Sequence, residues 1–102
     1  MATFASTLVP GEQNGAKVAG LAAATASAEQ NVGNNNIIAV SATGAYYISF
    51  GVTGMAAATN TSFLIPAGVV SEWDMGRQFT HFRVFNGGAA AIDVHWIRLS
   101  KF

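Results

Sequence analysis

The chain has 102 residues, the common size of a single domain, of which 51% are hydrophobic and only 10% are charged. Its five acidic and five basic residues cancel, which excludes the positive field that nucleic-acid-binding proteins use to attract phosphate. The absence of cysteine excludes a disulfide framework and thiolate chemistry.

The N-terminus, MATFASTLVPG, has neither the basic segment nor the long apolar core of a conventional signal peptide. Further along, Gly, Ser, Thr and Asn interrupt every apolar stretch before it reaches the ~18 residues of a membrane span. We therefore expect a protein that is made in a cytoplasm, has no membrane partner, and stays soluble or assembles.

Most apolar stretches are short and rich in β-branched or aromatic residues, and Gly, Pro and Asn clusters separate them, which is typical of an all-β protein. The pattern predicts a single domain over residues 1–102, an antiparallel β-sandwich resembling a jelly roll, with about eight short strands. The expected strands are residues 16–19, 22–29, 36–42, 45–52, 61–65, 69–75, 79–86 and 91–99.

The segment AGLAAATASAEQ is ambiguous, because alanine is the best helix former. Polar and small side chains nevertheless alternate along it with a period of two, which favours a strand over residues 22–29. The following NVGNNN is then an exposed loop, since asparagine tolerates left-handed backbone angles.

The middle of the chain is uncharged, because no Asp, Glu, Lys or Arg occurs from Gln30 to Ser71. Within it, IIAVSATGAYYISFG predicts a β-hairpin that turns at Thr43 and Gly44. A three-residue loop places one set of side chains on the core face: Ile38, Val40, Ala42, Tyr46, Ile48 and Phe50. The other face is small, aromatic and uncharged, and a two-residue loop reshuffles the two sets without adding a charge to either.

An ordinary antiparallel sheet alternates apolar residues inside with polar residues outside, so an uncharged outer face needs an explanation. Interface cores are depleted in charge and enriched in Tyr, Phe and Met, which favours contact with another protein. The alternative is a solvated Ser, Thr and Ala face on a stable monomer. The candidate interface residues are Ile37, Ala39, Ser41, Tyr47, Ser49, Met55, Phe63 and Arg77.

The sequence IPAG predicts a type I turn with Pro66 in its second position and Gly68 in its fourth. In the strand that follows, Glu72 and Asp74 face one way and Trp73 faces the core.

The segment HFRVFNGGAAAIDVHW predicts a final hairpin that turns at NGG. A three-residue loop pairs residues 82 with 94 and 84 with 92 on the core face. On the other face it pairs Arg83 with Asp93, as a cross-strand ion pair, and His81 with His95.

No strong catalytic signature is present, since the chain has no GxSxG, P-loop or HExxH motif. His81 and His95 could share a face, but a metal site needs a third ligand and none is evident. We therefore predict that the protein is not an enzyme and has no catalytic, cofactor-binding or metal-binding residue. Arg77 could reach a carboxylate of a neighbouring subunit.

Three stretches together resemble small phage virion proteins of the capsid decoration or cement type: the IIAVSATGAYYISFG segment, FLIPAGVVSEW and FRVFNGG...VHWIRL. The resemblance implies a β-sandwich or jelly-roll module at the capsid surface of the virion, made in the host cytoplasm. It implies the major capsid protein and copies of the chain itself as partners, in a trimer or dimer. It also implies that residues 1–15 can form an extended N-terminal arm.

A carbohydrate- or receptor-binding module of a phage tail or fibre is the alternative function. Such a site needs aromatic platforms beside polar groups. The candidates are Trp73, Trp96, Tyr46 and Tyr47.

Overall fold

The computed structural model describes residues 8–34 and 36–101, which form strands and no helix. The strands are β1 (Leu8–Leu21), β2 (Thr25–Ala26), β3 (Gln30–Asn31), β4 (Asn36–Ala42), β5 (Tyr46–Gly51), β6 (Phe63–Ile65), β7 (Ser71–Gly76), β8 (His81–Asn86) and β9 (Ile92–Lys101). Within these residues, no helix has the length and apolar character needed to cross a membrane.

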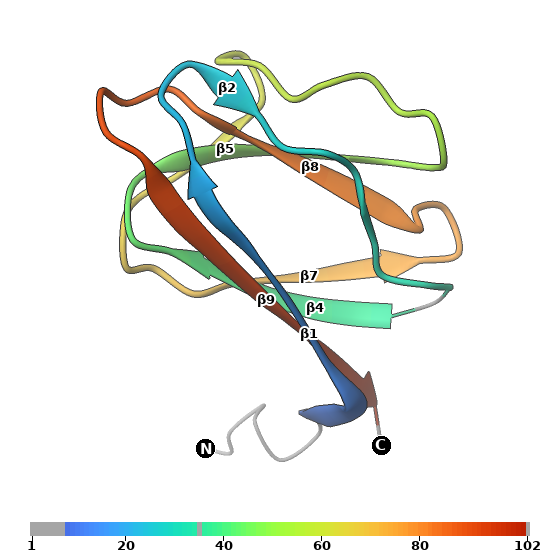
Figure 1. Ribbon diagram of the computed structural model, residues 1–102. Coiled ribbons are helices and arrows are strands. Elements are labelled where there is room, and N and C mark those ends of the chain that lie inside the picture. The colour runs from blue at the N-terminus through green and yellow to red at the C-terminus, as the bar shows by residue number, and fades with distance from the viewer. Residues whose placement is uncertain (1–7, 35, 102) are drawn as a thin grey trace.

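The strands form two antiparallel sheets packed together (Figure 1). The β4 sheet has the order β1-β9-β4-β7, and the β5 sheet has the order β2-β8-β5-β6, with β3 also paired to β8. The predicted all-β antiparallel sandwich is therefore confirmed.

The strand pairs describe one long hairpin that is folded over on itself. β5 pairs with β6 at its tip, followed by β4 with β7, β2 with β8, and β1 with β9. Successive pairs alternate between the two sheets, which is the order of a jelly roll, with β2 and β3 sharing one position beside β8. The jelly-roll-like arrangement predicted from the sequence is thus present.

The core lies between the two sheets, where every second side chain of a strand points inward. The predicted core face is confirmed, since Ile38, Val40 and Ala42 of β4 are buried, as are Tyr46 and Ile48 of β5. Phe50, the last residue of that set, is partly buried against the same core.

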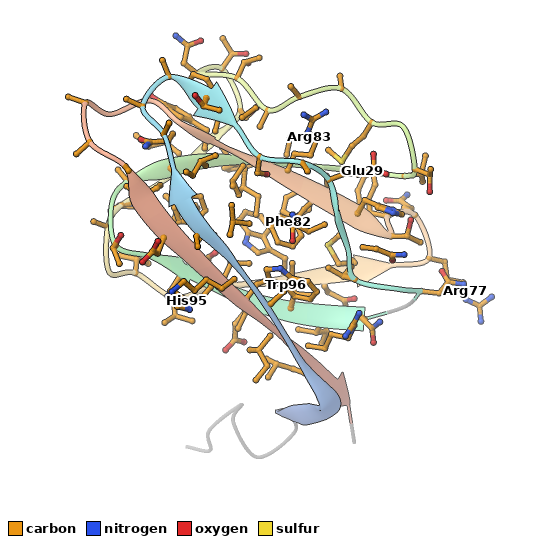
Figure 2. The ribbon with its side chains drawn as sticks, in the orientation of Figure 1. Glu29, Arg77, Phe82, Arg83, His95 and Trp96 are labelled. Carbon is orange, nitrogen blue, oxygen red and sulfur yellow. The ribbon has the colours of Figure 1, made fainter. Side chains whose placement is uncertain are left out.

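Two aromatic rings link the sheets across the core. Phe82 of β8 and Trp96 of β9 meet edge to face, with ring centroids 5.6 Å apart, and Figure 2 shows both between the sheets. Trp73 of β7 packs against the core from the side, while Glu72 and Asp74 are exposed, as predicted.

The prediction of one continuous strand over residues 22–29 is wrong. Ala24 has a positive φ of 54° within a turn, so the chain breaks before β2 and again before β3. Both short strands pair with β8, and buried Ser27 between them donates its backbone N–H to the Val84 carbonyl. Alternation along this segment therefore reflects an irregular edge that follows β8.

The predicted hairpin of residues 37–51 is wrong in its pairing. β4 and β5 follow each other in the chain but lie in different sheets. The connection at Thr43 and Gly44 is an arch between the sheets, so the two strands face each other through side chains. The predicted inward and outward side chains of the two strands are still correct, because side chains alternate between faces in the same way in an arch and in a hairpin.

The predicted hairpin of residues 81–96 is wrong for the same reason, because β8 belongs to the β5 sheet and β9 to the β4 sheet. The predicted ion pair of Arg83 with Asp93 is therefore absent. Asp93 lies 3.8 Å from the Lys17 ammonium and accepts the Gly20 backbone N–H at 2.8 Å. That backbone hydrogen bond is the main cause that holds the pKa of Asp93 below its usual value.

The turn after β6 differs by one position from the prediction. The Val69 backbone N–H donates to the Pro66 carbonyl at 3.4 Å, so Pro66 is first and Gly68 is third. Gly68 has a φ of 75°, which the third position of a type II turn requires.

The long strand β1 follows β9 over most of its length, from Leu8 opposite Lys101 to Leu21 opposite Ile92 (Figure 1). Residues 8–15 of the proposed N-terminal arm therefore lie in a strand of the chain's own sheet. Residues 1–7 lie outside the described residues, and the arm remains a prediction.

Candidate interaction surface

The predicted interface residues lie on several parts of the sandwich. Three are on β4 and face outward from the β4 sheet, and two are on β5 and face outward from the opposite sheet. The other three lie in the loop after β5, on β6 and after β7. In that order they are Ile37, Ala39 and Ser41, then Tyr47 and Ser49, then Met55, Phe63 and Arg77. The arch between β4 and β5 separates the first two groups, so the eight residues do not form one surface.

The chain's own loop of residues 52–62 lies against the outer side of the β5 sheet. Arg83 of β8 donates from Nε to the Ser27 carbonyl at 2.9 Å and from Nη1 to the Met55 carbonyl at 3.1 Å. Glu29 accepts the Gly54 backbone N–H at 2.9 Å. Figure 2 shows Arg83 and Glu29 on the side of the sheet where this loop runs. The loop therefore covers part of the uncharged face.

The close approach of the loop requires a glycine at the end of β5. A Cβ on Gly51 would lie 2.7 Å from the Met55 Cβ, nearer than two such atoms approach in proteins. Ala58 in the same loop is buried. Part of the uncharged sequence is therefore internal packing rather than an interface.

The two histidines do not share a face. His81 is buried on β8, with Nδ1 2.7 Å from the Thr80 hydroxyl and Nε2 3.7 Å from a Glu29 carboxylate oxygen. His95 is exposed on β9 in the other sheet, as Figure 2 shows. Across residues 8–34 and 36–101, no group of three His, Cys, Asp or Glu side chains could hold a metal ion.

Among the described side chains, the large apolar ones that are exposed come from the uncharged part of the chain. Between 45% and 65% of the surface of each is accessible to solvent. They are Val52, Phe63, Leu64, Val69 and Val70. Solvated apolar surface of this kind is typical of protein contact sites when it is grouped.

One group borders a shallow pocket of about 240 Å³ on the outer side of the β4 sheet, which we call the β4-face pocket. Its rim includes Ala39 and Ser41 from the predicted set, together with Val70, His95 and Ile97. Neutral side chains dominate this rim, which suits contact with another protein surface.

The second group lies where the edge strands β6 and β7 approach each other. Phe50 and Trp73 pack in a tilted arrangement with ring centroids 4.8 Å apart, and Phe63 meets Trp73 edge to face at 5.5 Å. With Phe79 and Met75 they line an aromatic slot of about 240 Å³, and Asp74 is its charged residue. Phe63 of the predicted set thus belongs to a different site from Ala39 and Ser41.

Leu64 and Val70 were missed by the sequence prediction. Each adjoins another large apolar residue, in FLI and in VV. In FLI, which forms β6, successive side chains point to opposite faces, so an unbroken apolar run places Leu64 outward. Val69 and Val70 precede β7, and both are exposed. The apolar run FLI was therefore a signal for Leu64, whereas Val70 lies in a connection whose exposure strand alternation does not predict.

Two of the four proposed carbohydrate platforms cannot serve as such. Trp96 and Tyr46 are buried, and the Tyr46 hydroxyl lies 3.3 Å from the Ser71 hydroxyl inside the sandwich. Trp73 is partly covered by Phe50 and Phe63. Tyr47 is half-buried, 6.2 Å from the ring of Phe85.

Comparisons of this chain with protein-family models, with curated proteins and with solved structures gave no match.

Proposed function

We propose that the protein is a non-enzymatic structural protein of a phage virion, which decorates or cements the capsid. The observation that carries the proposal is that, among the side chains that the structure describes, the five large apolar ones that are exposed come from residues 52–70, inside the stretch without Asp, Glu, Lys or Arg. An apolar surface without charged groups has a small free-energy cost of desolvation. Its burial against another protein is favourable in free energy.

The β4-face pocket is the proposed contact with the major capsid protein. Val70 projects from the connection between β6 and β7, with 62% of its surface exposed, beside small residues of β4. Individual contacts of this size are weak. On a capsid lattice, copies bound side by side act together, so modest contacts suffice for stable decoration.

The fold is compatible with a role in decoration, but it is equally compatible with other functions. Jelly rolls occur in viral capsid proteins, in lectins and in cupins, so architecture alone leaves all three classes open. The resemblance of the sequence to small virion proteins and the uncharged surface favour the first class. The proposed location is the capsid surface, after synthesis in the host cytoplasm.

Quantitative mass spectrometry of purified virions tests the proposal. A decoration protein is expected at a fixed molar ratio to the major capsid protein, and removal by mild denaturant is expected to lower the heat stability of the particle. Absence of the chain from the particles would contradict the proposal. Specific binding on a glycan array, with the chain on the tail, would favour the carbohydrate-binding alternative.

A further inference from the structure

The edges of the two sheets differ in charge. β7 ends the β4 sheet and carries Glu72 and Asp74, while β1 at its other edge carries Glu12 and Lys17. β6 ends the β5 sheet, has the sequence FLI, and pairs only with β5 among the described strands. The loop before β6 and the turn after it are also uncharged from residue 52 to residue 70.

This difference disfavours β7 as the edge that meets a second copy. In a two-fold contact each strand lies antiparallel to itself, so a charge near the axis faces its own copy. A β7 pair centred on Glu72 or Asp74 places like charges opposite each other. A β7 pair centred on Trp73 places Glu72 opposite Asp74, which is again repulsive. No such repulsion arises at β6.

Two of the three side chains of β6 are exposed, one on each face of its edge. Phe63 is 65% exposed and borders the aromatic slot, and Leu64 is 55% exposed on the outer face. Leu64 lies opposite Tyr47 of β5, which lies opposite Phe85 of β8. An apolar row therefore crosses the β5 sheet and stops at an open edge, which is where strand addition occurs.

We propose that β6 pairs antiparallel with β6 of a second copy, so that two β5 sheets become one continuous sheet. Leu64 lies on the two-fold axis, and Phe63 lies opposite the partner's Ile65. This register pairs all three residues of β6 with apolar residues and keeps inward side chains opposite inward ones. The inference rests on the proposed function in treating uncharged surface as a contact site, and it names the partner at this edge.

Cysteine cross-linking tests the register, because the natural chain has no cysteine. Leu64→Cys places two thiols across the axis, at the separation that a disulfide between facing strands needs. Val52→Cys is the matched control, since Val52 is 54% exposed but lies in the loop after β5. Under mild oxidation the L64C variant is expected to form disulfide dimer at least about tenfold faster than V52C, because pairing raises the local thiol concentration.

Light scattering at rising protein concentration tests the dimer without cross-linking. The wild-type chain is expected to approach twice its mass of 10.6 kDa. Leu64→Lys is expected to remain monomeric, because two ammonium groups meet on the axis, whereas Val52→Lys dimerises like the wild type. Circular dichroism checks that each variant is folded.

The outcomes separate this inference from the proposed function. A wild-type monomer at high concentration, a trimer, or equal cross-linking of L64C and V52C would overturn the β6 pairing. Monomers that still bind capsid shells would overturn it while supporting decoration. Dimers that ignore shells would support the β6 pairing and contradict decoration.

Discussion

Asn86 closes β8 and shows how one polar side chain organises a connection. It is fully buried, and its Nδ2 donates to the carbonyls of Leu21 and Ala90 at 2.9 and 2.8 Å. Its Oδ1 accepts the Gly88 backbone N–H at 2.9 Å. The NGG sequence, predicted as a hairpin turn, is therefore anchored to the end of β1 across the sandwich.

We expect Asn86→Ala to lower the free energy of unfolding by about 2 to 3 kcal/mol, because it leaves buried backbone groups without partners. Urea denaturation measures the change. Asn34→Ala, at an exposed loop position, is the matched control and should stay within about 0.5 kcal/mol of the wild type. Equal small effects of the two substitutions would contradict the anchoring role.

We expect the buried hydroxyl of Tyr46 to make the protein less stable at high pH. Burial raises the pKa of Tyr46 above 10.0, and the hydrogen bond to Ser71 only partly opposes this. Because the folded-state pKa is the higher one, the stabilisation is fully present below pH 10 and is lost as the pH rises through the folded-state value. Tyr46→Phe should flatten this alkaline decline, at a cost under about 1 kcal/mol at neutral pH. Denaturation curves from pH 8 to 11 test it, and an unchanged alkaline slope would contradict it.

At the scale of elements, the loop of residues 52–62 is held by side chains from two distant segments of the chain. Arg83 reaches it from β8, and Glu29 reaches it from the segment before β3. The loop supplies the neutral residues that looked like an interface, yet its anchoring groups are charged and distant in sequence.

We expect Arg83→Ala to speed hydrogen exchange of the backbone amides near Met55 by about tenfold or more, because two charge-assisted hydrogen bonds are lost. Hydrogen-exchange mass spectrometry measures the rate. Arg77→Ala, in the exposed turn after β7, is the control and should leave these rates unchanged. Slow exchange in both variants would show that other contacts hold the loop.

Alternation in the sequence predicted which side chains point inward, as at Ile38, Val40 and Ile48, because that choice is local. It could not predict the neighbour of each strand. A hairpin and an arch have the same alternating pattern, and they differ only in hydrogen bonds to distant strands, such as β4 to β9. The prediction of one continuous interface was wrong for the same reason. Ser41 and Ser49 were assigned to one face, but they lie on different sheets.

At the scale of the whole molecule, the jelly roll divides the uncharged middle of the chain among three environments. Part forms the core, part is the loop over the β5 sheet, and the remainder brings apolar side chains to the surface at Val52, at β6, and at Val69 and Val70. The surface available for docking is therefore smaller than the sequence suggested, and it is located at defined positions.

The most direct test of docking is co-sedimentation with undecorated shells of the major capsid protein from the same genome. The wild-type chain is expected to pellet saturably with the shells. Val70→Asp, which places a charge on the rim of the β4-face pocket, should weaken binding by about tenfold or more, whereas Asn60→Asp, at an exposed polar position, should bind like the wild type. A wild-type chain that stays in the supernatant, or a V70D variant that binds as tightly as the wild type, would contradict the account.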